Sequence, residues 1–293
     1  MKSKILITGS TGFVGRNLVP KLAKRGYEIL EISRDLSRSD YLFKSTTQKL
    51  QIDDVDFNQK LIKFKPEIVL HLASFLTSSN KFTDIERLIN VNILFLSKIL
   101  DAIKDVELKL FINTGTASEY MMGNDEFQPA NIYAATKTAS RYFVDYYACL
   151  NNFNQTTIVP YNIYGGQDSQ KKIIDFICDS MSSSTPIDLS PGYQILDFIH
   201  IDDVTDFYVF IIENYYKLPN KSNYKLGTGV GHTLRQVADY CEEISGRKPN
   251  INWGGIDYRK TEIMCAIADM KKYKLDWKPK ISLKEGLIRL IKK

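Results

Sequence analysis

Residues 4–15 have the sequence Lys4-Ile5-Leu6-Ile7-Thr8-Gly9-Ser10-Thr11-Gly12-Phe13-Val14-Gly15. The first five are mostly apolar and end in a β-branched run, which is typical of a buried strand, and Val14, Leu18 and Leu22 then recur at helical spacing. Glycines between a strand and a helix let the backbone turn sharply and approach a pyrophosphate, whose charge is held by N–H groups at the helix N-terminus. The segment therefore predicts a dinucleotide-binding turn. The predicted contacts are Gly9, Thr11, Gly12, Phe13, Val14 and Gly15.

Strand and helix patterns alternate after this turn. Strands are expected at residues 27–33, 68–73, 109–113 and 157–159, and longer helices at residues 84–104 and 133–150. This alternation predicts an α/β fold with a doubly wound parallel Rossmann sheet. From about Gly165 onward, clusters of Gly, Pro, Ser and Asn interrupt the pattern. We therefore expect a Rossmann domain at residues 1–164 and a smaller lobe at residues 165–293, with some segments of the latter returning to the Rossmann domain.

The end of the second predicted strand is where an acidic residue would bind the adenosine ribose of NAD. Ser33 occupies this position, followed by Arg34 and with Arg38 nearby. A serine beside guanidinium groups can bind a 2′-phosphate, which a carboxylate would repel. The sequence therefore favours NADP as the cofactor. NAD stays open as the alternative, because Glu31 or Asp35 could reach the ribose.

The composition is that of an ordinary globular protein. The chain has 293 residues, of which 44% are hydrophobic, and a formal net charge of +5. This charge is spread along the sequence, which suits an anionic ligand but does not indicate nucleic acid. The four cysteines and three histidines have no metal-ligand spacing, so we expect no metal. Without a leader-like segment or an apolar run of about 20 residues, we expect a cytoplasmic protein with no membrane partner.

Tyr133 and Lys137 lie four residues apart, about one domain's length after the glycine turn. In a helix they share one face, so the lysine ammonium can stabilise a tyrosine phenolate, whose free pKa is about 10. Tyr133 is therefore a candidate proton donor or acceptor. The spacing is common by chance, and two residues on a solvated helix face is the alternative interpretation. Together with the glycine turn, the pair indicates nicotinamide redox chemistry.

Further motifs follow in a fixed order. They are His71-Leu72-Ala73, Asn90-Val91, the segment 114–120, Asn162-Ile163-Tyr164-Gly165, the segment 197–204 and Asp276-Trp277-Lys278-Pro279. With the glycines and the tyrosine–lysine pair, they make the chain resemble the extended short-chain dehydrogenase/reductases, the family of nucleotide-sugar epimerases, dehydratases and reductases. The resemblance covers nearly the whole chain. Its C-terminal half is most similar to nucleotide-sugar 4-ketoreductases of the CDP-abequose synthase type.

The resemblance implies roles for individual residues. Thr116 would hydrogen-bond the sugar oxygen, Tyr133 would exchange a proton, and Lys137 would lower the pKa of the tyrosine and hold the nicotinamide ribose. Thr114 is the alternative to Thr116. The resemblance also implies cofactor contacts from Leu72, Ala73, Asn90 and Lys137, and nucleotide-sugar contacts from Thr77, Thr116, Asn162, Lys172 and Arg259.

The substrate side departs from the family pattern at two positions. Leu196 and Val159 stand where relatives often carry arginine, which removes expected diphosphate contacts. Lys171, Lys172 or Arg259 could hold the diphosphate instead. For Asn162, a turn-stabilising amide at a strand end is an almost equal alternative to substrate binding.

The reaction expected from the resemblance is reduction at C4 of a nucleotide-diphosphate 4-keto sugar, in deoxysugar or surface-polysaccharide biosynthesis. Dehydratases of the family carry Asp-Glu after the triad threonine, whereas this chain has Ala117-Ser118, so dehydration ranks low. The alternative is a C4 epimerase or C4 dehydrogenase of a nucleotide hexose or heptose with tightly bound NAD. A non-catalytic dinucleotide sensor ranks below both.

The helix expected at residues 133–150 has more apolar residues than one buried stripe requires. This excess predicts a homodimer, with a higher oligomer as the alternative.

Overall fold

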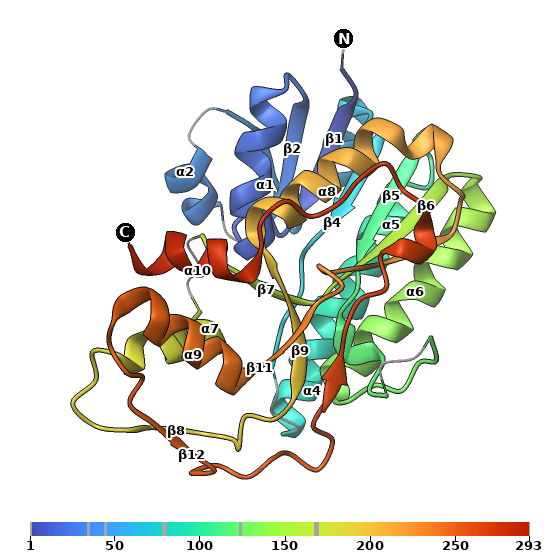
Figure 1. Cartoon of the computed structure of the whole chain (residues 1–293). Coiled ribbons are helices and arrows are strands. Elements are labelled where there is room, and N and C mark those ends of the chain that lie inside the picture. The colour runs from blue at the N-terminus through green and yellow to red at the C-terminus, as the bar shows by residue number, and fades with distance from the viewer. Residues whose placement is uncertain are drawn as a thin grey trace. The chain divides into compact units, whose positions relative to one another are not determined.

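The computed structural model describes residues 2–33, 36–43, 46–77, 81–122, 125–166 and 170–292. The chain forms two compact units and crosses between them several times (Figure 1). Unit 1 comprises residues 1–116, 131–159 and 205–224, and unit 2 comprises residues 117–130, 160–204 and 225–293.

Unit 1 is built on a seven-stranded sheet. In spatial order its strands are β10 (Ser222–Leu226), β6 (Asn154–Pro160), β5 (Leu110–Thr114), β4 (Ile68–His71), β1 (Lys4–Thr8), β2 (Glu28–Ser33) and β3 (Gln48–Gln51). All pairings from β6 to β3 are parallel. The β1 strand lies between β2 and β4, so the strand order reverses beside it, as in a doubly wound Rossmann sheet. The predicted fold class is confirmed.

Helices cover both faces of this sheet. They are α1 (Phe13–Lys24), α2 (Ser37–Phe43), α3 (Phe57–Phe64), α4 (Phe82–Ile89), α5 (Phe95–Ala102), α6 (Ile132–Asn151) and α8 (Ile201–Asn214). On β5, Phe111 packs into a buried cluster with residues of α3, α5 and α6, whereas the Thr114 hydroxyl lies 2.7 Å from the Tyr208 hydroxyl of α8. Because neighbouring side chains of a strand alternate between faces, α6 and α8 lie on opposite sides of the sheet. An ion pair of 2.9 Å between Lys21 and Asp206 joins α1 to α8.

The long helix predicted at residues 84–104 is divided into three parts. A π-helical turn, η1 (Asn90–Leu94), separates α4 from α5. A π turn inserts a residue into the helical ladder without a compositional signal, so the apolar periodicity did not reveal it.

The described residues of unit 2 form small sheets and three α-helices. One sheet has β7 (Asn162–Tyr164), β9 (Ile195–His200), β11 (Gly231–Thr233) and β13 (Cys265–Ala266), and another pairs β8 (Ile187–Leu189) with β12 (Ile251–Trp253). The helices are α7 (Ile173–Ser180), α9 (Leu234–Ser245) and α10 (Leu283–Ile291). Single 3₁₀ turns occur at η2 (Ala117–Glu119), η3 (Tyr215–Lys217) and η4 (Lys271–Tyr273), of which η3 belongs to unit 1. Residues such as Ile177, Val237 and Leu287 bring α7, α9 and α10 into one buried cluster.

Candidate active site

The glycine turn between β1 and α1 is packed too tightly for larger residues. Gly9 has a φ of +71°, and a Cβ added there would lie 2.5 Å from the Ala73 backbone nitrogen. A Cβ at Gly15 would lie 2.3 Å from the Gly9 carbonyl oxygen. Gly12 occupies the N-cap position of α1 and brings no side chain to cap the helix. This close-packed, uncapped helix N-terminus fits the pyrophosphate of a dinucleotide.

Two further features of the turn agree with this fit. The Ser10 hydroxyl is buried and has no hydrogen-bond partner among the described residues. The Arg16 guanidinium donates to the Thr11 carbonyl oxygen at 3.1 Å and so fixes the outer side of the turn. An unsatisfied buried hydroxyl is costly, which is consistent with a polar ligand at this position.

The end of β2 is described only in part. Arg34, with Asp35, lies outside the described residues, whereas Ser33 closes β2 and Arg38 is exposed on α2. Glu31 is fully buried, and its carboxylate accepts hydrogen bonds from the hydroxyls of Ser39, at 2.8 Å, and Thr47. This carboxylate therefore anchors α2 within the fold.

Tyr133 and Lys137 lie in the first two turns of α6. They are 8% and 2% exposed, so the alternative of a solvated helix face is wrong. The Asn131 side chain caps this helix by accepting a hydrogen bond of 2.8 Å from the Ala134 backbone N–H. A buried lysine ammonium needs polar or charged partners. A ribose hydroxyl and a tyrosine phenolate would be partners of this kind.

The two candidate threonines differ. Thr116 follows β5 and is half-buried, and the Gly115 N–H before it donates to the Ile158 carbonyl oxygen at 2.7 Å. Thr114 is engaged with Tyr208, whose pKa is raised by burial. Thr116, Tyr133 and Lys137 all belong to unit 1, together with the glycine turn.

The sequence did not single out Asn92, which connects helix α6 to the loop after β4. Asn92 lies in the π turn η1 and is buried. Its side-chain oxygen accepts from the Phe75 N–H at 2.8 Å, and its nitrogen donates to the Phe75 carbonyl oxygen and to the Thr136 hydroxyl at 3.3 and 3.0 Å. The Thr136 hydroxyl in turn donates to the Tyr133 carbonyl oxygen at 2.7 Å. Asn92 therefore ties the loop after β4 to the helix turn that carries Tyr133.

Asn90, the predicted cofactor contact in this segment, is exposed at the start of η1, whereas Asn92 is buried. The N-x-N spacing in this segment was the available signal for Asn92. Of the other predicted contacts in unit 1, Leu72, Ala73 and Thr77 are all half-buried in the segment that leaves β4. Ala73 donates its N–H to the Thr8 hydroxyl at 3.2 Å, which joins the ends of β4 and β1.

The residues predicted to bind the sugar nucleotide lie partly in unit 2. The Asn162 side-chain nitrogen donates to the Asp197 carbonyl oxygen at 3.0 Å, so this amide at least links β7 to β9. Lys172 is half-buried at the N-cap of α7, where its backbone N–H donates to the Asp175 carboxylate at 2.7 Å. Arg259 is exposed, and its backbone N–H donates to Glu262 at 3.3 Å.

A buried carboxylate organises the loop after β10. Asp197 is fully buried and accepts hydrogen bonds from the N–H groups of Thr228, Gly229 and Ala268 at 2.9, 2.8 and 3.2 Å. The Thr228 hydroxyl adds a fourth at 2.6 Å. A Cβ at Gly227 would lie 2.3 Å from an Asp197 oxygen, so the loop needs glycine there.

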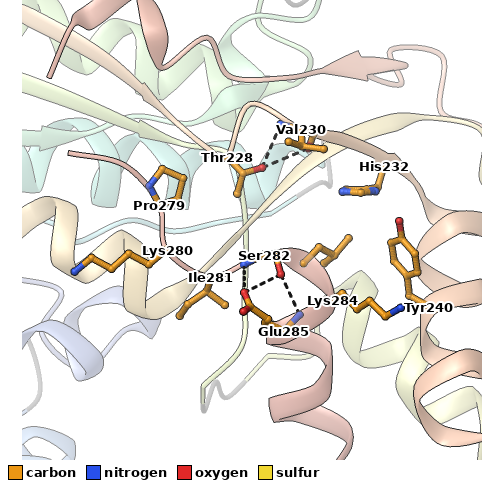
Figure 2. Close-up of a pocket in the computed structure, with 11 residues that line it drawn as sticks. Thr228, Val230, His232, Tyr240, Pro279, Lys280, Ile281, Ser282, Lys284 and Glu285 are labelled. Atoms are coloured by element: carbon orange, nitrogen blue, oxygen red, sulfur yellow. Dashed lines mark hydrogen bonds between the residues drawn. The ribbon is translucent and has the colours of Figure 1, made fainter. Parts of the chain in front are cut away.

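Unit 2 also contains a cavity of about 430 Å³. Figure 2 shows His232 and Tyr240 on one side, with the Lys284 side chain reaching toward Tyr240, and Pro279, Lys280 and Ile281 on the other side. Burial lowers the pKa of His232, although Asp197 opposes the shift. None of the predicted substrate residues lines this cavity.

Two kinds of site are absent from the described part of the chain. No cluster of three or more His, Cys, Asp or Glu side chains there could hold a metal ion. None of the helices in that part combines the length and the apolar character that crossing a bilayer requires.

The site can be compared with known proteins. The sequence model of the NAD dependent epimerase/dehydratase family matches residues 5–227. The chain belongs to this family. The resemblance inferred from the motifs is thereby confirmed, and this family member is an enzyme that depends on a nicotinamide dinucleotide.

Relatives within the family cover the full chain. It is 26% identical to the CDP-abequose synthase of Salmonella typhimurium, with 100% of this chain and 99% of the relative aligned. It is 27% identical to the CDP-abequose synthase of Yersinia pseudotuberculosis over 99% of this chain and 100% of the relative. Among solved structures, a UDP-glucose 4-epimerase of Thermotoga maritima superposes with a TM-score of 0.85 at 23% identity, covering 99% and 97% of the two chains.

Proposed function

We propose that this enzyme reduces C4 of a nucleotide-diphosphate 4-keto sugar, with NADPH as the reductant. The observation that carries the proposal is the end-to-end similarity to CDP-abequose synthases, in a chain whose Tyr133–Lys137 pair is buried. Such a reaction would serve deoxysugar or surface-polysaccharide biosynthesis in the cytoplasm.

In this mechanism the glycine turn and the N-terminus of α1 hold the pyrophosphate, while Lys137 holds the nicotinamide ribose. The bound nicotinamide supplies a hydride for the sugar carbon. Tyr133 donates its hydroxyl proton to the oxygen at C4, and the Lys137 ammonium stabilises the phenolate that remains. Thr116 orients the sugar by a hydrogen bond to the same oxygen. Asn162, Lys172, Arg259 and Thr77 bind the rest of the nucleotide sugar.

Replacing Tyr133 by Phe tests the proton donor. We expect kcat to fall by about 10²- to 10⁴-fold, because the variant keeps the ring but lacks the proton. Turnover is followed as loss of NADPH absorbance with nucleotide-diphosphate 4-keto sugars. Tyr147→Phe on the same helix is the matched control and should keep wild-type turnover. Normal activity of Tyr133→Phe would disprove the mechanism.

The competing function is C4 epimerisation with retained NAD. It is favoured by a relative named UDP-glucose 4-epimerase from Mycolicibacterium smegmatis, 24% identical over 98% of this chain. The two functions differ in stoichiometry, because a reductase consumes one NADPH per product and an epimerase consumes none. Denaturing freshly purified protein and identifying the released nucleotide by mass spectrometry separates them further. Tightly held NAD would support the epimerase and contradict the reductase.

The proposed preference for NADP rests on the charge beside Ser33. A 2′-phosphate binds guanidinium groups through charge-assisted hydrogen bonds, whereas the buried Glu31 carboxylate is already engaged by two hydroxyls. Arg38→Ala should therefore weaken NADPH binding by about tenfold and leave NADH binding nearly unchanged. Fluorescence titration with each nucleotide measures both affinities. Equal losses for the two nucleotides would count against the assignment.

We further propose that a second copy of this chain covers the outer face of α6. Tyr142, Tyr146 and Leu150 are each at least 60% exposed and recur every four residues, which forms one apolar stripe. Such a stripe on a 20-residue helix suits packing against the same helix of a partner. Light scattering should show a dimer that Tyr146→Lys converts to monomer. A monomeric wild-type protein would contradict this proposal.

A further inference from the structure

A row of polar side chains crosses the centre of the unit 1 sheet. Thr8 of β1 pairs with His71 of β4, His71 pairs with Asn113 of β5, and Asn113 pairs with Thr157 of β6. Directly paired residues of neighbouring strands point to the same face. All four residues are buried, at 5% exposure or less. Thr8 and His71 end their strands and Asn113 is next to the end of its strand, yet all three are buried. Buried side chains of a doubly covered parallel sheet are normally apolar, so this row needs a physical reason.

Asn113 is the unsatisfied member of the row. It is 0% exposed, and neither its side-chain nitrogen nor its side-chain oxygen has a hydrogen-bond partner among the described residues. His71 differs, since its Nδ1 lies 3.0 Å from the Thr8 hydroxyl. A buried amide has two donors and acceptor capacity on its oxygen, and leaving all of them unused is costly.

The row lies on the face that α6 covers. Phe111, two residues before Asn113 on the same face of β5, shares a buried cluster with Val144 and Ala148 of α6. Moving from Phe111 to Asn113 advances by two residues along the strand, about 6.6 Å. Four residues along a helix span about 6 Å, so the part of α6 opposite Asn113 is the turn of Lys137 and Ser140.

His71 gives independent evidence for this placement. Its pKa is lowered to about 3 by burial and, secondly, by the charge of Lys137. His71 is thus uncharged at neutral pH and close enough to the Lys137 ammonium to respond to it. Asn113, its neighbour in the sheet, extends the same polar cluster.

We infer that Asn113 forms an internal hydration site beneath the catalytic helix, in which a water molecule bonded to the Asn113 amide helps to solvate the Lys137 ammonium. Buried waters in proteins typically make about three hydrogen bonds to polar groups that would otherwise be unsatisfied. The site makes Asn113 a positioning residue, because it acts through Lys137. The functional part of the inference rests on the proposed contact between Lys137 and the nicotinamide ribose.

The pH dependence of cofactor binding reports on this site. Lys137 binds the ribose as an ammonium, so NADPH affinity should weaken above the pH at which this group loses its proton. Removing polar groups from beside a buried cation disfavours its charged form. The titratable groups of the cluster among the described residues are His71 from β4, Tyr133 and Lys137 from α6, and Tyr208 from α8, which interacts with Tyr133. The remaining neighbours from the sheet, Thr8 and Thr157, do not titrate.

The experiment compares NADPH titrations of four proteins across the alkaline range. In Asn113→Leu, which cannot hold the water, the loss of affinity should begin about one pH unit lower than in the wild type. Asn113→Ser keeps a polar group and room for water and should restore the wild-type profile. Thr156→Val removes a hydroxyl from the adjacent residue of β6 on the other face and should change nothing. Coincident profiles for Asn113→Leu and the wild type would overturn the role assigned to Asn113.

A high-resolution crystal structure tests the hydration site itself. It should show a water within hydrogen-bond distance of the Asn113 amide, and an amide bonded only to protein groups would overturn the inference even if Asn113→Leu fails to fold. Neither measurement uses a nucleotide sugar. Failure of the proposed reaction would therefore appear in turnover assays alone, whereas failure of the hydration site would appear in the structure and the pH profiles.

Discussion

Asp197 in unit 2 and Asn113 in unit 1 are both fully buried polar residues on central strands, but their surroundings differ completely. Asp197 accepts four hydrogen bonds, three of them from backbone N–H groups. The Asn113 amide has no partner among the described residues. The protein itself therefore supplies the hydrogen bonds of the Asp197 carboxylate, but not those of the Asn113 amide.

This difference separates two uses of buried polarity. A carboxylate whose acceptors are all used holds a loop in one conformation, since each donor would be left unpaired in any other arrangement. A cluster with unused hydrogen-bond capacity beside a buried lysine instead provides a polar environment for a functional charge. Changes at Asp197 should therefore lower the free energy of unfolding. Changes in the row that contains His71 and Asn113 should instead alter how properties that depend on the protonation of His71 and Lys137 vary with pH.

The largest expected effect is that of Asp197→Ala. The substitution leaves three backbone N–H groups without their shared acceptor, and the one on Ala268 is buried away from water, so we expect the free energy of unfolding to fall by about 3–5 kcal/mol. Urea unfolding monitored by circular dichroism measures this loss. Asp197→Asn keeps one acceptor oxygen and should lose about half as much. If both variants were as stable as the wild type, the loop would not depend on the carboxylate.

The His71 ring should make stability depend on pH. Its pKa is about 3 in the folded protein and about 6.5 when unfolded. The unfolded state therefore binds more protons between these values, and stability falls as the pH drops through this window, by about 1.4 kcal/mol per unit. Unfolding at about pH 7 and about pH 5 should show a difference that His71→Gln reduces. An undiminished difference in His71→Gln would mean that other groups titrate instead.

The sequence predicted those features that depend on local pattern. The turn at Gly9 and Gly15 and the tyrosine–lysine pair on α6 follow from residue type and spacing, and the sheet follows from the alternation of strands and helices. The structure supplies what local pattern cannot contain. Beyond the N-x-N spacing, the role of Asn92 becomes visible through its bonds to Phe75 and Thr136, which lie 17 and 44 residues away in the chain.

The same reason explains why the polar row and the Asp197 loop were not found. Thr8, His71 and Asn113 each lie at or near the end of an ordinary strand pattern, and only the strand order places them side by side. Asp197 belongs to the family motif at residues 197–204, but its partners Thr228 and Ala268 are 31 and 71 residues away in the chain. Pairing between distant segments depends on topology, which composition and periodicity do not specify.

The smallest expected effect comes from Thr228→Val, which separates the contribution of the hydroxyl bond to Asp197 from that of the backbone N–H groups. The variant removes the hydroxyl bond of 2.6 Å to Asp197 but keeps the three backbone donors. Because Thr228 is half-exposed, water can replace the hydroxyl at the carboxylate, and we expect a loss of only about 1 kcal/mol in urea unfolding. Asp197→Ala combined with Thr228→Val should be only slightly less stable than Asp197→Ala alone. The second change removes a donor that has already lost its carboxylate acceptor, and otherwise only the bond of 3.2 Å that the Thr228 hydroxyl accepts from the exposed Val230 N–H. Fully additive losses would show that the Thr228 hydroxyl stabilises the loop through Val230 and not through Asp197.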